Sequence, residues 1–169
     1  EDLFFKPRFV EDALATAAEL VQATKGTAVS LLLPTIWREG HHLHNAVVLA
    51  EDGKVVARRY KRELPNDDVF YEKRYFTPGP LPEPVTIKGV TIGVPICEDV
   101  WHRPVCEYLV GQGAELLLCP NGSPYWTNKQ HTRKDLIRAR TNEDKVPLLY
   151  LNQVGGQDEL VFDGASFAI

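Results

Sequence analysis

The sequence has few cysteines and no long apolar run. Its 169 residues include three cysteines, an odd number without close spacing, which excludes a disulfide framework and a cysteine-rich zinc site. No apolar stretch approaches the roughly 18 residues of a membrane helix, and the first residues lack the basic and apolar regions of a secretory signal. We therefore expect a cytoplasmic protein, in a reducing compartment, that has no membrane segment.

Basic residues are also slightly fewer than acidic ones. Lys and Arg total 19 against 23 Asp and Glu, so the net charge is −4. This balance argues against a broad surface for nucleic acid or an anionic membrane. A hydrophobic fraction of 44% with 25% charged residues is typical of a globular chain and excludes disordered, collagen-like and coiled-coil proteins. Since the sequence shows no repeat, low-complexity segment or linker, we expect a single domain.

Helical and strand patterns alternate along the chain. Apolar residues recur on one helix face over 9–24, and further helices are expected over about 104–112 and 129–144. The predicted strands are 27–33, 46–49, 55–60, 85–87, 90–96, 115–119, 146–151, 161–162 and 166–169. Asp-Gly at 52–53 and Lys-Gly at 88–89 predict two hairpins. The alternation predicts an α/β fold with a mixed sheet. Between the strands, 61–84 holds five prolines and reads as a long functional loop.

Cys97 lies where an α/β protein can place a nucleophile. It follows an apolar strand and precedes a helix, a position that exposes a side chain beside backbone N–H groups. The alternative is a small buried hydrophobic residue, which is the usual place of a lone cysteine. Cys106 and Cys119 fit that alternative, because neither has a base nearby in the sequence.

The histidines are poorly placed to activate a thiol. His41, His42 and His44 lie together in what reads as a polar loop before a strand, and no third ligand recurs at metal-binding spacing, so we predict no metal site. Lys61 and Glu72 are better candidates for acid–base chemistry. Lys61 follows directly on a predicted strand, and Glu72 lies in the proline-rich loop. On composition alone, the usual interpretation of Lys61 is a solvent-exposed residue at the end of a strand.

Five segments carry distinctive motifs. They are K-R-E-L-P-N at 61–66, V-F-Y-E-K-R-Y-F at 69–76, I-G-V-P-I-C-E-D-V-W at 92–101, P-N-G-S-P-Y at 120–125 and N-Q-V-G-G-Q-D-E-L-V-F-D-G at 152–164. These motifs resemble those of the nitrilase-type glutaminase domain of glutamine-dependent NAD synthetases. The C-E-D-x-W pattern marks the nitrilase superfamily as a whole. The last and longest segment narrows the resemblance to this group of synthetases, and the likeness extends over the whole chain.

The resemblance implies a four-layer αββα sandwich. Residues 1–169 would form one partial glutaminase domain, without its first strand and helix and without its C-terminal part. The ATP-dependent synthetase domain would lie outside this chain, and ATP and Mg²⁺ would belong there. No cofactor is implied for the glutaminase domain itself.

The resemblance also assigns roles to individual residues. Cys97 would be the nucleophile, and Lys61 with the backbone N–H of Glu98 would stabilise the oxyanion. Glu72 would be a second carboxylate that supports Lys61 and the amino group of the substrate. The glutamine pocket would be lined by Ser123, Arg133, Trp101 and Tyr125.

The implied reaction is hydrolysis of glutamine to glutamate and ammonia through a cysteine thioester. The ammonia would serve the amidation of deamido-NAD by a synthetase domain of the same polypeptide, in a homo-oligomer. The family's general-base Glu has no counterpart here, so we expect residues 1–169 alone to be inactive. Asp67 stands where the family often has Tyr, which bears on substrate fit. Two alternatives are a free-standing carbon–nitrogen hydrolase acting on another amide or nitrile, and a non-catalytic nitrilase-like remnant.

Overall fold

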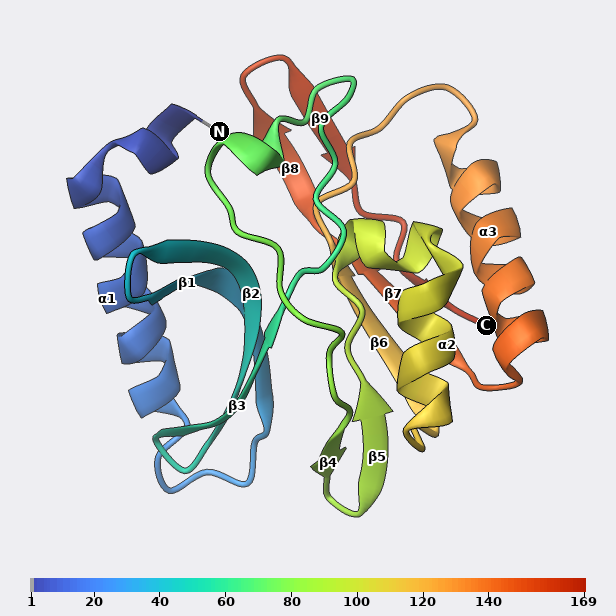
Figure 1. The fold of residues 1–169 in the computed structure, drawn as a ribbon, viewed down its shortest axis with the longest axis horizontal. Coiled ribbons are helices and arrows are strands. Elements are labelled where there is room, and N and C mark those ends of the chain that lie inside the picture. The colour runs from blue at the N-terminus through green and yellow to red at the C-terminus, as the bar shows by residue number, and fades with distance from the viewer. Residues whose placement is uncertain (1) are drawn as a thin grey trace. The chain divides into compact units, whose positions relative to one another are not determined.

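The computed structural model describes residues 2–169, and the chain forms two compact units (Figure 1). The first unit ends at Pro80, and the second is Leu81–Ile169. Each unit has a sheet with helical elements packed against it. Among residues 2–169, no helix combines the length and the apolar character needed to cross a membrane.

The first unit is built on an antiparallel sheet of three strands, in the order β1-β2-β3. Its elements are η1 (Asp2–Phe5), α1 (Pro7–Ala23), β1 (Leu31–Glu39), β2 (His42–Glu51), β3 (Lys54–Tyr60) and η2 (Glu72–Arg74). The apolar face of α1 packs on the sheet through Val21, which contacts Val48 and Ala50. The helix predicted over 9–24 is thereby confirmed, and the stripe of apolar residues that predicted it faces the core.

The predicted hairpin between β2 and β3 is confirmed. Asp52 and Gly53 have φ of 45° and 75°, which is the pattern of the tight turns that match the twist of paired strands. Several strand boundaries were predicted wrongly: the strand expected over 27–33 is Leu31–Glu39, and the strand expected over 90–96 ends at Gly93. β1 continues through Pro34, which an edge strand tolerates because a proline there loses no ladder hydrogen bond. β2 begins at His42, so the expected polar loop is a strand; the His44 ring stacks on Tyr60 at 4.3 Å between centroids.

The second unit is built on a mixed sheet of five strands, in the order β10-β7-β6-β5-β4. Its elements are β4 (Val85–Ile87), β5 (Val90–Gly93), η3 (Cys97–Trp101), α2 (Arg103–Gly111), β6 (Leu116–Asn121), α3 (Lys129–Asp144), β7 (Leu148–Asn152), β8 (Val154–Gln157), β9 (Leu160–Asp163) and β10 (Phe167–Ala168). The central strands β5, β6 and β7 are parallel, and the two edge strands are antiparallel, which confirms the predicted mixed sheet.

The core of the second unit lies between this sheet and its helices. Leu109 of α2, Leu117 of β6 and Ile137 of α3 are buried in one apolar cluster. The helix predicted over 129–144 has these same bounds. β8 and β9 form a separate hairpin that turns at Asp158, with φ of 52°, rather than at the glycine pair 155–156, which lies in β8.

Gly93 ends β5 against the buried core, and a side chain there has no room. A Cβ at this position would lie 2.6 Å from Leu117 Cδ2 and 3.1 Å from Leu109 Cβ. We predict that Gly93→Ala lowers the free energy of unfolding by about 1–3 kcal/mol, measured by urea denaturation. Gly111→Ala is the matched control, because nothing lies within 4 Å of a Cβ there and alanine favours the helix. Equal stability of the two variants would contradict the packing argument.

Candidate functional site

Cys97 lies at a sharp turn between β5 and the 3-10 helix η3. Its φ is +48°, a left-handed conformation that costs a non-glycine residue about 1–2 kcal/mol. The carboxylate of the buried Asp99 stabilises the turn, because Asp99 Oδ2 accepts the Ile96 N–H at 2.9 Å. The structure thus places Cys97 at the predicted strand-to-helix turn, half-buried and in strained backbone. Such strain concentrates at functional sites.

The residues that follow Cys97 form the first turn of η3. The N–H of the second residue in such a turn has no acceptor within the turn, so the geometry suits the predicted oxyanion donor, Glu98. The Glu98 carboxylate instead contacts His102 Nε2 at 3.2 Å. Trp101 is half-buried against the core, and the buried Lys129 Nζ lies 4.9 Å from its ring centroid.

The other two cysteines are buried and remain protonated. Burial and, to a lesser extent, the nearby Asp144 carboxylate raise the pKa of the Cys106 thiol to about 12. Burial also raises the pKa of Cys119, with a second contribution from Cys97. The three cysteines form no disulfide. Cys97 is therefore the most accessible of the three thiols to a reagent.

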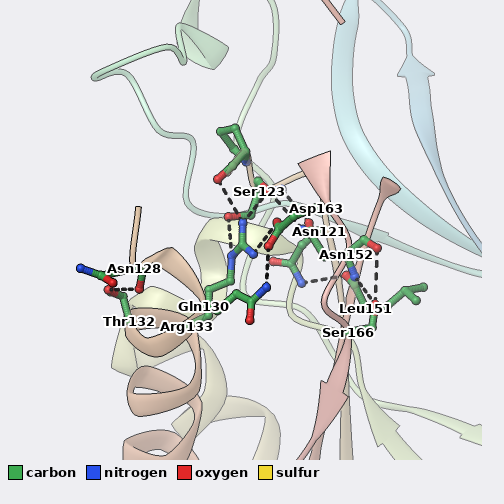
Figure 2. A network of polar contacts seen from close by, with 11 residues as sticks. Asn121, Ser123, Asn128, Gln130, Thr132, Arg133, Leu151, Asn152, Asp163 and Ser166 are labelled. Carbon is green, nitrogen blue, oxygen red and sulfur yellow. Dashed lines mark hydrogen bonds and ion pairs between the residues drawn. The ribbon is translucent and has the colours of Figure 1, made fainter. Parts of the chain in front are cut away.

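Arg133 holds together the second group of predicted site residues. Its side chain is 1% exposed, and it donates from Nε to Ser123 Oγ at 3.2 Å and from Nη2 to the Ser123 and Pro124 carbonyls at 2.7 and 3.0 Å. Nη1 pairs with Asp163 Oδ1 at 2.8 Å (Figure 2). The structure therefore brings Ser123 and Arg133 into direct contact. These contacts of the Arg133 guanidinium are with other residues of the chain. The guanidinium therefore holds the Ser123 segment in place.

Asn152 fixes the same segment from the end of β7. Its side chain accepts the Ser123 N–H at 2.8 Å and donates to the Ser123 carbonyl at 3.1 Å. Ser166 Oγ in turn accepts the Asn152 N–H at 2.9 Å (Figure 2). Tyr125 is exposed, and its own N–H donates to the Val161 carbonyl of the hairpin at 2.7 Å. The Ser123 hydroxyl is thus presented from a loop fixed on several sides.

Lys61 and Glu72 form a buried ion pair in the first unit. Lys61 Nζ lies 2.6 Å from Glu72 Oε1, and the Lys61 side chain is 1% exposed. Asn45 Nδ2 donates to the other Glu72 oxygen at 3.3 Å, and the Asn45 carbonyl accepts the Lys61 N–H at 2.8 Å. The solvated interpretation of Lys61 is wrong, because β3 delivers the side chain into the interior beside a carboxylate.

Sequence reasoning missed several residues that support these groups. Asn152, Asp163 and Asn45 were not predicted, although each contacts a predicted residue, and neither was Asp99, which bonds the Ile96 N–H next to Cys97. Asn152 could have been predicted, because it ends a strand of the buried type, as Asn121 does. In the structure the two residues pair in register at the ends of β7 and β6. Among residues 2–169, no group of three or more His, Cys, Asp or Glu side chains is arranged to hold a metal ion.

Comparisons with known proteins cover nearly the whole chain. A family model for carbon–nitrogen hydrolases matches residues 3–169. The glutamine-dependent NAD(+) synthetase of Rhodobacter capsulatus is 46% identical over 170 residues, which cover 100% of this chain and 30% of that protein. The chain thus spans about 30% of the length of the curated relatives it matches.

Two solved structures support the same fold. The glutamine-dependent NAD+ synthetase from Acinetobacter baumannii, in complex with ADP, is 31% identical with a TM-score of 0.91, over 99% of this chain and 32% of that one. A mutant amidase from Nesterenkonia sp. AN1, with acrylamide added at its active site cysteine, is 26% identical with a TM-score of 0.82, over 95% and 62%. The matches confirm the nitrilase-type α/β fold that the resemblance implied.

The Asp163–Arg133 pair generates a prediction about pH. Burial raises the Asp163 pKa, but hydrogen bonds from Arg133 and Gln130 outweigh this effect and lower it. A lowered folded pKa gives stability that is present above the ordinary Asp pKa of about 3.9 and is lost as pH falls through the folded value. We predict that Asp163→Asn lowers the free energy of unfolding by about 2 kcal/mol near pH 7. The difference from the unaltered protein should shrink towards pH 3 or so, measured by urea denaturation.

Asp135→Asn is the matched control, since it removes an exposed carboxylate that pairs with Arg138 on the same helix. An exposed pair contributes little, so this variant should match the unaltered protein at every pH. A stability difference for Asp163→Asn that does not change with pH would contradict the assigned pKa direction.

Proposed function

Because the chain belongs to the carbon–nitrogen hydrolase family, we propose that it carries the glutaminase activity of a glutamine-dependent NAD(+) synthetase. The support is the 46% identity with the Rhodobacter capsulatus enzyme, which extends over the whole chain. The proposed reaction hydrolyses glutamine to glutamate and ammonia. The ammonia then serves an ATP-dependent amidation of deamido-NAD, carried out by a synthetase domain of the same polypeptide.

The observation that carries this proposal is the placement of Cys97. A thiolate there would attack the amide carbon of glutamine, and the C–N bond would break with a proton delivered to the departing ammonia. Water would then hydrolyse the thioester and release glutamate, which restores the thiol. The strained, half-buried turn supports this role, and so does the amidase from Nesterenkonia sp. AN1, whose active site cysteine takes up acrylamide.

The tetrahedral intermediate of this reaction carries an oxyanion. In the proposal, the Glu98 N–H and the Lys61 ammonium stabilise it. Lys61 suits that role because it is buried, and a charge in a dry environment interacts more strongly than one in water. Glu72 holds the ammonium in place through the 2.6 Å contact.

The remaining predicted residues would form the glutamine pocket. Ser123 would offer a hydroxyl from the fixed loop, and Trp101 and Tyr125 would offer aromatic surface. Arg133 acts in this proposal by holding Ser123, since its donors are used by Ser123, Pro124 and Asp163. No cofactor is proposed for these residues; ATP and Mg²⁺ would belong to the synthetase domain. The full protein would be a cytoplasmic homo-oligomer.

A second candidate function is hydrolysis of another amide by a free-standing enzyme. The similarity to the Nesterenkonia amidase favours it, because that match also covers 95% of this chain. It uses the same thiol chemistry but needs no ATP-dependent partner. The two functions differ in substrate, so one assay separates them.

The test compares Cys97→Ala with the unaltered full-length protein that carries this chain. We predict that Cys97→Ala reduces glutamine hydrolysis by about 10⁴-fold or more, measured as released glutamate, because the covalent route is lost. Ammonia supplied directly should still support NAD formation by that variant. Cys106→Ala is the control and should retain glutamine hydrolysis, since its thiol is buried and protonated.

Undiminished glutamine hydrolysis by Cys97→Ala would show that Cys97 is not the nucleophile. Turnover of a simple amide with none of glutamine would favour the free-standing hydrolase. No turnover of either substrate, and no labelling of Cys97 by an electrophilic glutamine analogue, would favour the non-catalytic remnant.

A further inference from the structure

The 3-10 helix that begins at Cys97 is a short element with little support of its own. η3 has five residues, and a 3-10 helix has poorer hydrogen-bond geometry than an α-helix. Cys97, its first residue, has a φ of +48°, and strained backbone of this kind persists only where the surrounding structure holds it in place. Asp99 Oδ2 holds the start of the helix, because it accepts the Ile96 N–H.

Arg140 of α3 anchors the other end of η3. Its Nε donates to the Val100 carbonyl at 3.1 Å, and its Nη2 donates to the Trp101 carbonyl at 3.3 Å. The last carbonyls of a helix have no N–H partner within that helix, so donors from elsewhere bind them. Val100 is 0% exposed, so its carbonyl relies on a donor from the protein rather than on water. Arg140 therefore joins the end of η3 to a helix that lies forty residues later in the sequence.

The shape of the guanidinium suits this anchoring role. Nε and Nη2 lie on one edge of a rigid plane, so the two bonds together fix the positions of two successive carbonyls. Nη1 pairs with the Glu143 carboxylate, which lies one turn further along α3 and orients the guanidinium. The Arg140 side chain is 12% exposed. Hydrogen bonds from a charged donor with so little contact with water are stronger than those between neutral groups.

We propose that Arg140 is a positioning residue for Cys97. By holding the end of η3, it keeps the Cys97 thiol and the Glu98 N–H in the arrangement that attack on an amide requires. A displacement of about 1 Å in such an arrangement can cost about 100-fold in rate, even when its cause lies away from the reacting atoms. The inference rests on the proposed role of Cys97 as nucleophile, and it assigns to α3 a part in that reaction.

The test compares Arg140→Met and Arg140→Lys in the full-length protein that carries this chain, with glutamine hydrolysis measured as released glutamate. Methionine keeps an apolar stem without donors, and lysine keeps the charge without the planar fork. We expect kcat to fall about 100-fold in Arg140→Met and about tenfold in Arg140→Lys. KM for glutamine should stay within about threefold, because Arg133 and Asn152 hold the Ser123 segment independently of Arg140. NAD formation from added ammonia should be unchanged.

Amide hydrogen exchange gives a second measurement that needs no substrate. Exchange in a peptide over 97–103 should be faster in both variants, because the end of η3 is released, whereas exchange in β6 should be unchanged. Arg138→Met is the matched control on the same helix. Its exposed side chain pairs with Asp135, so this variant should match the unaltered protein in kcat and in exchange.

An unchanged kcat in the two Arg140 variants would overturn the proposal, as would a raised KM at constant kcat or an equal loss in Arg138→Met. Faster exchange throughout the second unit would also overturn it, because Arg140 would then stabilise the whole unit rather than position η3. If Arg140→Met does not fold, Arg140→Lys decides. Absence of glutamine turnover in the unaltered protein would contradict the proposed function as well, whereas turnover that survives both substitutions contradicts this inference alone.

Discussion

The cost of burying a charge constrains both units of this protein. Lys61 in the first unit and Arg133 in the second are each 1% exposed. Removing such a cation from water costs several kcal/mol, which only a close anion and further hydrogen bonds can offset. Glu72 serves Lys61, and Asp163 serves Arg133. Glu72 lies eleven residues after Lys61, and Asp163 lies thirty residues after Arg133. Satisfying these charges therefore fixes the segments that carry the two carboxylates.

The residues of the proposed chemistry lie in or beside these segments. The Ser123 segment is held by Arg133 and Asn152, so its hydroxyl is fixed before any substrate arrives. One feature is unfavourable for stability, namely the left-handed backbone of Cys97. Proteins retain such features where activity requires them, at a cost in stability. The rigid supports and the strained turn thus have complementary roles in the proposed site.

Local patterns in the sequence predicted most of the fold. The apolar stripe gave the first helix, and Asp52 with Gly53 gave a hairpin, because both depend on neighbours a few residues apart. The strand through Pro34 could not be predicted in this way, since its tolerance depends on β1 lying at a sheet edge. The turn at Cys97 was predictable for the same local reason. The contact of Arg133 with Asp163, thirty positions later, which helps to hold the Ser123 segment, emerges only from the folded chain.

The central claim is that Cys97 forms a covalent bond with the acyl group of glutamine. The most direct measurement mixes the full-length protein with glutamine, quenches the reaction in acid within its first turnovers, and maps modified peptides by mass spectrometry. The account predicts a γ-glutamyl thioester on the peptide that contains Cys97, which hydroxylamine removes. Glutamine hydrolysis with Cys97 unmodified, or with the acyl group on another residue, would contradict it.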